Sequence, residues 1–253
     1  MTTPVFVVEP GALDDVAPGG QWTLIGPEAR HAASVQRLRA GESIEVVDGA
    51  GVRLRGRVGP GSDAQAVVID VVDTLREAPP MPRLVLVQAL AKGGRDEMAV
   101  EAATELGVDV VRPWQSERSV VQWRGDKPAK GEQRWRALVH AASKVARRAW
   151  LPEVAPFVQG DRLVEVVEQA VGRGADVLVL HEVASVPLTA LPPSTAPEVV
   201  VVIGPEGGLS DREVDALTGA GARAVLLGPH VLRSSTAGPA ALAVLAASTG
   251  RWG

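Results

Sequence analysis

Over the first 77 residues, short apolar stretches alternate with glycine-rich turns, a pattern typical of short strands. The strands expected are Val5–Val8, Trp22–Ile25, Ser43–Val47, Val52–Val58 and Ala66–Val72, with one helix over Pro27–Leu38. Around Asp48-Gly49 the pattern predicts a β-hairpin, because Asp-Gly is a favoured two-residue turn. We therefore expect residues 1–77 to form a small β-barrel domain.

A proline-rich linker over 78–82 follows, and beyond it strands alternate with helices. The strands expected are Leu84–Leu90, Val108–Val111, Asp176–Leu180, Glu198–Ile203 and Ala222–Leu227. The helices expected are Arg95–Leu106, Gln133–Arg148, 161–171, 210–219 and Thr236–Ser248. Because these strands are apolar on both faces, the pattern favours an α/β fold with a mostly parallel sheet covered on both sides.

The composition excludes several classes of protein. The 253 residues are 46% apolar and 22% charged, with a formal net charge of −4, which is not typical of a disordered chain. No cysteine is present, so thiol nucleophiles, disulfides, iron–sulfur clusters and cysteine-ligated zinc are excluded. The four histidines are dispersed, and no metal site is expected. Without a visible secretory signal or a membrane-length apolar run, we expect a soluble cytoplasmic protein.

Basic side chains are concentrated between residues 112 and 148. This stretch holds ten Lys or Arg against three Asp or Glu, a net charge of +7, and four of the six tryptophans lie in it or just after it. Such a stripe suits a polyanion with exposed bases, but it also fits a solvated helix face with buried tryptophans. Similarly, the return strand of the hairpin carries Arg53, Arg55 and Arg57 on one face. This face either contacts phosphate or is simply the solvent-exposed face of the sheet.

Three loops follow strands at the edge where α/β sheets commonly bind ligands. The segment from Gly204 to Ser210 is rich in glycine and leads into a helix with a capping-box pattern, so its backbone can approach a ligand closely. The other two are Leu226–Thr236 and Leu180-His181-Glu182. Together they suit a flat heterocycle with a polar tail. Neither a dinucleotide fingerprint nor a P-loop occurs, and Ser210 is better explained as a helix cap than as the nucleophile of a hydrolase.

Several of these strings resemble one known family. The paired segments Ile203-Gly204-Pro205-Glu206-Gly207-Gly208-Leu209-Ser210 and Leu227-Gly228-Pro229-His230-Val231-Leu232-Arg233 resemble motifs of the ribosomal small-subunit RNA methyltransferase E family, a branch of the SPOUT superfamily. Further matches in the same order are Lys92-Gly93-Gly94-Arg95, Glu105-Leu106-Gly107-Val108, Ser116-Glu117-Arg118 and Leu151-Pro152-Glu153. His31, Leu38-Arg39, Gly41 and Asp48-Gly49 resemble that family's PUA-like RNA-binding barrel.

The resemblance implies a fold and a reaction. It implies a PUA-like β-barrel over 1–77, and then a SPOUT-type α/β domain over 78–253 with a carboxyl-terminal trefoil knot holding the cofactor site within about 176–245. The implied reaction is S-adenosylmethionine-dependent methylation of N3 of a uridine in small-subunit (16S) ribosomal RNA, by a homodimer acting on the assembled or assembling 30S subunit. The cofactor-binding residues carried over by position are Leu180, His181, Glu182, Gly204, Glu206, Gly207, Gly208, Leu227, Gly228, Val231, Leu232 and Arg233.

Two arginines, Arg118 and Arg233, are the catalytic candidates, because a cation there would stabilise negative charge developing on the uracil oxygen. An alternative for Arg118 is a salt bridge that positions its loop, with Glu117 or Glu101 as partner. A base for the N3 proton is left open among Glu117, Glu206 and His230. RNA contacts are expected at Arg53, Arg55, Arg57, Lys92, Arg95, Arg118, Arg147 and Arg148.

The chain departs from the family pattern at a few positions. Lys144-Val145 replace a common Glu-Gln pair, Arg147 replaces a glycine, and Ser234-Ser235-Thr236 replace Thr-Glu-Thr. Any role of the replaced residues does not transfer to this protein. Two other functions stay open: a SPOUT methyltransferase acting on another RNA such as transfer RNA, and a non-catalytic RNA-binding module.

Overall fold

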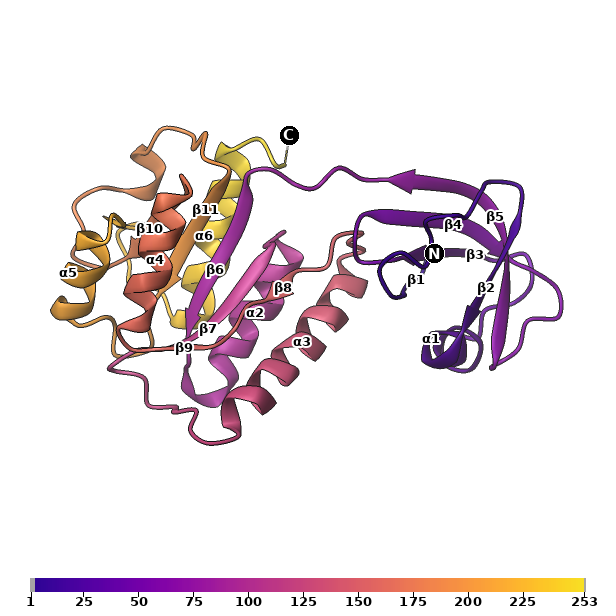
Figure 1. The fold of residues 1–253 in the computed structure, drawn as a ribbon, viewed down its shortest axis with the longest axis horizontal. Helices are drawn as coiled ribbons and strands as arrows, with labels where there is room; N and C mark the ends of the chain where they lie inside the picture. Colours follow the sequence, from indigo (N-terminus) through magenta and orange to yellow (C-terminus); the bar gives the residue numbers. More distant parts are fainter. Residues whose placement is uncertain (1–2, 253) are drawn as a thin grey trace. The chain divides into compact units, whose positions relative to one another are not determined.

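The computed structural model describes residues 3–252, and its contacts divide the chain into two compact units (Figure 1). The first unit runs to Pro79 and also includes Ser143–Leu151, whereas the second comprises Pro80–Ala142 and the chain from Pro152 onward. The division at Pro79 falls in the proline-rich linker. The sequence, however, placed all of 78–253 in one domain. Ser143–Leu151 belong to the first unit because their backbone bonds to the hairpin around Asp48-Gly49. Gly51 N donates to Ala149 O at 3.1 Å, and Leu151 N donates to Gly49 O at 3.0 Å.

The first unit is built on a five-stranded sheet in the order β1-β3-β4-β5-β2. The strands are β1 (Val5–Val7), β2 (Gln21–Ile25), β3 (Ser43–Val47), β4 (Val52–Val58) and β5 (Ala66–Arg76). β1 pairs with β3 in parallel and the other pairs are antiparallel, so the predicted β3–β4 hairpin is confirmed. The predicted single helix is instead a short α1 (Gly26–Arg30) that continues into a π-helical turn, η1 (His31–Val35).

The arginines of β4 have different environments although they share a face. Arg53 is 7% exposed, because Glu45, Glu77 and the segment Ser143–Leu151 surround it. Its guanidinium donates to Glu45 at 2.8 Å, to Glu77 at 2.7 Å and to Arg147 O at 2.8 Å. Arg55 and Arg57 are exposed. The buried Arg53 is therefore a packing residue of this unit, which corrects its expected place on an RNA-facing surface.

The second unit is built on a seven-stranded sheet in the order β12-β10-β11-β6-β7-β8, with β9 also pairing with β7. All its strand pairs are parallel, as predicted. The strands are β6 (Arg83–Ala89), β7 (Val110–Gln115), β8 (Glu153–Val154), β9 (Val158–Gln159), β10 (Asp176–Leu180), β11 (Glu198–Ile203) and β12 (Arg223–Val225). The helices are η2 (Lys92–Gly94), α2 (Arg95–Glu105), α3 (Lys127–Val145), α4 (Arg162–Gly172), η3 (Leu188–Ala190), α5 (Asp211–Gly219) and α6 (Ser234–Ser248).

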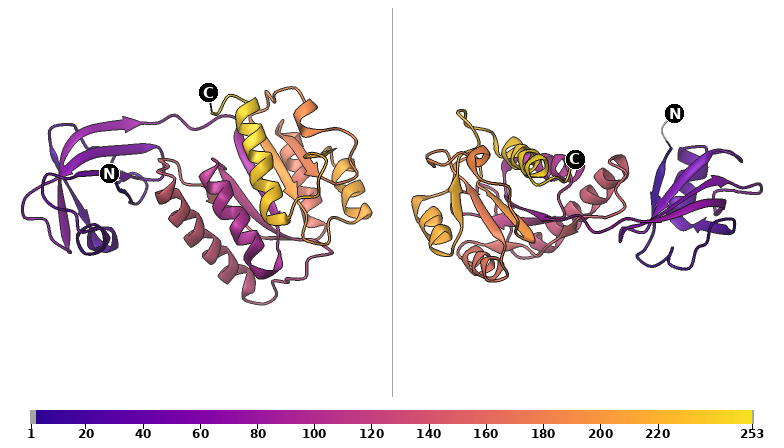
Figure 2. Two further views of the ribbon diagram at one scale, coloured as in Figure 1. Left: turned by 180° about the vertical axis from the view of Figure 1, so that it is seen from behind. Right: turned by 90° about the horizontal axis from the view of Figure 1, so that it is seen from above.

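Helices cover both faces of this sheet, as the two-sided apolar strands predicted. α2, α6 and the part of α3 up to Ala142 pack on one face, where Leu84, Leu86 and Val201 lie in the same core as residues of these helices. α4 and α5 pack on the other face against Val85, Val87 and Val202. Figure 2 shows α2 and α6 side by side over the sheet. The strongly apolar strands are thus shielded from water on both sides.

The tryptophans of the basic stretch belong to the core. Trp114, Trp123 and Trp135 are 1%, 6% and 0% exposed. Trp123 and Trp135 meet edge to face at 6.1 Å, and Gly131 in α3 makes room for Trp123. The structure therefore supports the interpretation as buried anchors, and these three rings are not a stacking surface for bases.

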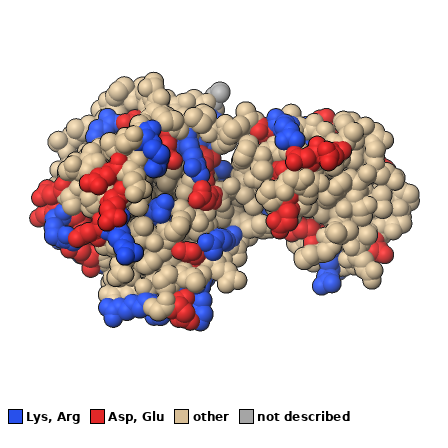
Figure 3. All heavy atoms as spheres, viewed as in Figure 1, with Lys and Arg blue, Asp and Glu red and all other residues tan. Residues whose placement is uncertain are grey.

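The basic side chains around them are largely paired. Lys130, Arg134 and Arg136 form ion pairs with Asp126, Glu97 and Glu132. On the face of the second unit seen in Figure 3, Lys and Arg are accordingly mixed with Asp and Glu. Acidic partners therefore offset part of the net charge of +7 along 112–148.

Candidate active site

Three loops meet where β10, β11 and β12 end. These strands are neighbours in a parallel sheet, so their carboxyl ends share one edge. The loops after β10 and β12 are directly bonded, because Leu188 N donates to Leu226 O and Leu226 N donates to Val186 O, both at 2.8 Å. His181 N also donates to Val225 O at 3.0 Å. The structure thus joins two of the three segments that the sequence singled out, and the third begins at the same sheet edge, beside β10.

The loop after β11, from Gly204 to Ser210, needs glycine at two of its positions. A Cβ on Gly204 would lie 3.0 Å from Leu209 Cδ2 and 3.2 Å from the Gly208 carbonyl carbon, so any side chain forces a shift. Gly208 has φ +68°, the left-handed region that favours glycine, and its N–H donates to Pro205 O at 2.9 Å. At Gly207 a Cβ would make only an ordinary contact, at 3.4 Å from Arg118 Cβ.

Glu206 ties this loop to the segment after β6. Its Oε1 accepts a hydrogen bond from Lys92 N at 2.9 Å and one from Arg95 Nη1 at 3.2 Å. The side chain is 20% exposed. Because both contacts of this carboxylate join the loop to another segment, the geometry favours a loop-holding role for Glu206.

Ser210 caps α5, as predicted. Its Oγ accepts from Glu213 N at 3.2 Å while Glu213 Oε2 accepts from Ser210 N at 3.0 Å, which completes a capping box. Glu213 has a second partner, since its Oε1 accepts from Glu117 N at 2.8 Å. The first turn of α5 therefore also anchors the segment after β7.

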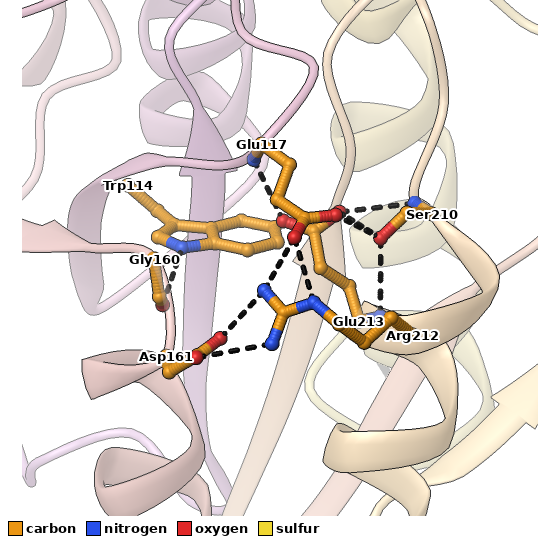
Figure 4. Close-up of polar contacts among 7 residues, drawn as sticks. All are labelled: Trp114, Glu117, Gly160, Asp161, Ser210, Arg212 and Glu213. Atoms are coloured by element: carbon orange, nitrogen blue, oxygen red, sulfur yellow. Dashed lines mark hydrogen bonds and ion pairs between the residues drawn. The ribbon is translucent and has the colours of Figure 1, made fainter.

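A charged network surrounds Glu117 (Figure 4). Its carboxylate accepts a hydrogen bond from Ser210 Oγ and one from Arg212 Nε, the latter at 2.7 Å. Arg212 also donates to Asp161 at the start of α4, at 3.0 Å. The Ser210 hydroxyl and the Arg212 guanidinium hold the pKa of Glu117 below its usual range, and Arg212 likewise lowers the pKa of Asp161. Glu117 is thus a stable carboxylate, which disfavours it as a proton acceptor.

Arg118 points to the glycine-rich loop. Its Nη1 donates to Gly207 O at 3.0 Å and to Leu209 O at 3.1 Å. The partners are backbone carbonyls, whereas the positioning alternative had named Glu117 or Glu101. The structure shows a loop-holding contact for Arg118, and its catalytic role stays a prediction.

The loop after β12 differs from the loop after β11. Gly228 has φ +130°, and a Cβ there would have open space around it. Val231 is 78% and Leu232 37% exposed, and His230 and Arg233 are exposed as well. Within residues 3–252, the side chains of His230 and Arg233 make no hydrogen bond or ion pair with the protein. This loop therefore presents free cationic and apolar groups.

The remaining predicted residues lie in several places. Leu180 is half-buried at the end of β10, and Glu182 after it is exposed. Lys92 is exposed, whereas the Arg95 guanidinium is bonded to Glu206. Arg147 and Arg148 belong to the first unit and are half-buried.

Arg147 has a structural task in that unit. It adopts φ +56°, its Nη2 donates to Thr3 O at 2.7 Å, and its own carbonyl accepts from Arg53. The left-handed conformation explains why glycine suits this position. Because Arg148 Nε likewise donates to Trp150 O at 3.0 Å, changing these two arginines would disturb packing as well as any RNA contact.

Sequence reasoning missed part of this arrangement. The capping-box pattern pointed to Ser210 and Glu213, but nothing in the spacing linked Arg212 and Asp161 to Glu117. Ser234, in the first turn of α6, is 5% exposed, and its Oγ has no partner in the described part of the chain. Between residues 3 and 252 we find no helix long and apolar enough to cross a membrane and no group of three potential metal ligands.

Comparisons with known proteins place this geometry in a family. The model of the RNA methyltransferase domain matches residues 77–246. A ribosomal RNA small subunit methyltransferase E from Mycobacterium bovis is 42% identical over 227 residues, which cover 90% of this chain and 86% of the relative. This chain belongs to the ribosomal RNA small subunit methyltransferase E family.

Solved structures agree with that membership. The methyltransferase E of Neisseria gonorrhoeae, crystallised with S-adenosylmethionine, superposes with a TM-score of 0.83 at 25% identity, over 97% of this chain and 98% of that one. A methyltransferase from Legionella pneumophila with the same bound cofactor gives 0.80 at 29% identity, over 98% of each chain. The methyltransferase E family thus accounts for both units of the chain, and the site described above lies within the matched domain.

Proposed function

We propose that this protein transfers the methyl group of S-adenosylmethionine to N3 of a uridine in small-subunit ribosomal RNA. The observation that carries the proposal is the meeting of the loops after β10, β11 and β12 at one sheet edge, in a chain of the methyltransferase E family. The cofactor would be held by the segments Leu180–Glu182, Gly204–Gly208 and Leu227–Arg233. Relatives crystallised with S-adenosylmethionine support this choice.

The residues at the edge fit that cofactor. Gly208 and Gly228 have open space where side chains would project, so a ligand can lie against the backbone. Val231 and Leu232 offer apolar surface for a flat heterocycle. The buried, unpartnered Ser234 Oγ adds a polar group at the start of α6. Such a mixture suits a molecule with an aromatic ring and a charged tail.

When bound, S-adenosylmethionine supplies an electrophilic methyl group on a sulfonium. The protein's task is then to align the uracil nitrogen and to favour loss of its weakly acidic N3 proton. Because Glu117 and Glu206 are bonded to cations and N–H groups, we assign the base role to neither. His230 stays a candidate, since its exposed ring has no partner in the described residues.

Arg233 is the cation that we assign to the uracil oxygen. It lies between the glycine turn at Gly228 and the first residue of α6, and its guanidinium is exposed and unpaired within the described chain. A guanidinium beside the oxygen stabilises the anionic ring formed when the proton leaves. Arg118 could add to this field, but its Nη1 is already bonded to the glycine-rich loop.

RNA would contact exposed basic residues of each unit. In the first unit these are Arg55 and Arg57, and in the second they are Lys92 and the exposed basic residues near the start of α3 (Arg124, Lys127 and Lys130). Phosphate contacts of this kind make affinity fall steeply with salt. The first unit would be the PUA-like RNA-binding domain that the family resemblance implies.

Two further properties belong to this proposal. The loops after β10 and β12, bonded at Leu188 and Leu226, lie where the resemblance implies a trefoil knot within about 176–245. The resemblance also implies a homodimer, and Met98, Val120 and Val183 of the second unit are 59%, 68% and 77% exposed. Light scattering of the purified protein tests the dimer directly.

The decisive experiment measures methyl transfer from labelled S-adenosylmethionine to 30S subunits, free 16S RNA and transfer RNA. The proposal predicts incorporation into small-subunit RNA, mapped by mass spectrometry to N3 of one uridine. Incorporation only into transfer RNA would show another RNA methyltransferase. A protein that binds RNA but not the cofactor would be a non-catalytic module, and the proposal would fall.

A further inference from the structure

Glu117 and Arg118, two neighbouring residues after β7, bond consecutive parts of the glycine-rich loop. Arg118 Nη1 donates to the carbonyls of Gly207 and Leu209, at 3.0 and 3.1 Å. Glu117 accepts from the hydroxyl of Ser210, the next residue. The two side chains therefore hold both sides of the junction between Leu209 and Ser210.

The Glu117 side chain is itself fixed from two helices. Arg212 of α5 donates to it at 2.7 Å, and the same guanidinium reaches Asp161 before α4 at 2.9 Å (Figure 4). The Glu117 carboxylate is 37% exposed and Arg212 55% exposed. Exposed ion pairs each contribute little to stability, so we expect these contacts to define the geometry of the segment more than to hold the fold together.

The main chain of this segment has a separate anchor. Glu117 N donates to Glu213 Oε1 at 2.8 Å, and Glu213 is 5% exposed within the capping box of α5. Removing the Glu117 side chain therefore leaves the backbone attached. What the substitution removes are the contacts of the Glu117 carboxylate with Ser210 and Arg212, directly beside the residue Arg118.

We infer that Glu117 is a positioning residue that acts through Arg118. With the carboxylate bonded to Ser210 and Arg212, Arg118 is directed to the carbonyls of Gly207 and Leu209, and the loop is pre-formed for the cofactor. This inference deepens the proposed function and rests on it. It also explains why Glu117 is unsuited to accept the N3 proton, since its carboxylate is already bonded to Ser210 and Arg212.

The test is a double-mutant cycle read by calorimetric titration with S-adenosylmethionine. We expect Glu117→Ala and Arg118→Ala each to weaken binding about 10-fold, the range of couplings between residues in one network. If Glu117 acts through Arg118, the double variant binds like Arg118→Ala alone. Independent effects would multiply to about 100-fold and overturn the inference, as would wild-type affinity of Glu117→Ala.

Two variants separate positioning from general destabilisation. Glu117→Gln keeps an oxygen that can accept from Ser210 or Arg212, so we expect partial rescue, to about a 3-fold loss of affinity. Glu153→Ala removes a comparable exposed pair with Arg83, at 2.8 Å, and should leave binding unchanged. If Glu153→Ala lowered cofactor affinity as much as Glu117→Ala, the loss would reflect general destabilisation. That result would overturn the inference.

A readout without cofactor distinguishes failure of this inference from failure of the proposed function. In the ligand-free protein, Glu117→Ala should speed hydrogen exchange of the amides from Gly207 to Ser210 about 10-fold, because the contacts that hold the Gly207 and Leu209 carbonyls and the Ser210 hydroxyl are weakened and the loop opens more often. Amides of α4 should be unaffected. Unchanged exchange in the loop would overturn the positioning role even where the wild type methylates RNA. Faster exchange in a protein that does not bind S-adenosylmethionine would instead overturn only the proposed function.

Discussion

The loops after β11 and β12 lie at the same sheet edge, yet the protein restrains them very differently. In the first loop, Glu206, Gly207, Leu209 and Ser210 all bond to side chains or backbone of other segments. In the second, His230 and Arg233 have no side-chain partner among the described residues, and Val231 is 78% exposed. One loop is therefore shaped before any ligand arrives, whereas the other has bonding capacity left for a ligand.

The difference suggests a division of labour. A pre-formed loop loses little conformational entropy on binding, so it suits the part of the site that determines cofactor affinity. A loop with a free guanidinium suits contact with the reacting base, because the interactions of that side chain can strengthen in the transition state. This division predicts that removing a restraint on the first loop changes cofactor affinity, whereas removing the free Arg233 guanidinium of the second loop changes the rate.

The largest effect is expected for Arg233→Ala. Loss of a cation facing the developing charge should lower kcat on the order of 100-fold. Cofactor affinity should change much less and Tm should stay the same, since the Arg233 side chain makes no hydrogen bond or ion pair with the described residues, and its backbone carbonyl, which accepts from Thr236 N and Ala237 N, is kept in the variant. Single-turnover methylation measures the rate, and Arg162→Ala, at an exposed arginine of α4, is the matched control. A wild-type rate in Arg233→Ala would contradict the division of labour.

A smaller loss is expected for Gly204→Ala in the restrained loop. The new Cβ would lie 3.0 Å from Leu209 Cδ2 and 3.2 Å from backbone, and such overpacking costs about 2 kcal/mol. The free loop relieves this contact by shifting, and binding to the native loop shape restores the strain, so calorimetry should show S-adenosylmethionine binding about 30-fold weaker. In the control, Gly219→Ala at the end of α5, the added Cβ meets nothing within 4 Å and affinity should not change. Equal affinities for the two variants would show that this loop's shape is not what the cofactor recognises.

Removing Glu206 should cost still less. Glu206→Ala breaks the bonds to Lys92 N and Arg95 Nη1, and a charged hydrogen bond contributes about 1.5 kcal/mol, so affinity should fall about 10-fold. Glu206→Gln keeps an oxygen for Lys92 N and should fall between the alanine variant and the wild type. The same titration measures both variants. A greater loss in the glutamine variant would indicate that the carboxylate charge itself meets the cofactor.

The sequence predicted the strands and helices of the second unit better than it predicted the side-chain contacts around the loop after β11. β10 and β11 have the expected bounds, because long runs of Val, Leu and Ile between polar ends define a buried strand. The two-residue strands β8 and β9 were missed, since they are too short to produce a pattern. α3 begins at Lys127, six positions before the expected residue 133, because Pro128 is tolerated in a first helical turn.

Side-chain partners across the fold were harder to predict. The glycine motif was evident, but the side-chain bonds that link Glu117, Arg212 and Asp161 join residues 51 and 95 positions apart along the chain, and no local spacing reports such contacts. For the same reason the alternation of Arg53, Arg55 and Arg57 located a face without revealing that Ser143–Leu151 covers one end of it. The periodicity of a strand indicates which of its side chains share a face. It does not indicate which distant segment packs on that face.

The smallest effect concerns acid stability, and it tests whether the restraint on the first loop is electrostatic. Glu117 and Asp161 have pKa values lowered from their ordinary values of 4.5 and 3.8, by Ser210 and Arg212 for Glu117 and by Arg212 for Asp161. A lowered pKa in the folded state means that the contribution to stability is complete above the unfolded-state pKa and disappears as pH falls through the folded-state value.

We therefore expect Glu117→Gln to lower Tm slightly at pH 7, and the difference from wild type to shrink as pH falls below about 4. Both groups are exposed, so 1 M salt should reduce the difference at neutral pH as well. Differential scanning calorimetry between pH 3 and pH 7 measures this effect, with Glu153→Gln as the control pair. A difference that persists unchanged at pH 3 would mean that Glu117 holds the loop by packing, and the two loops would then differ in shape rather than in charge.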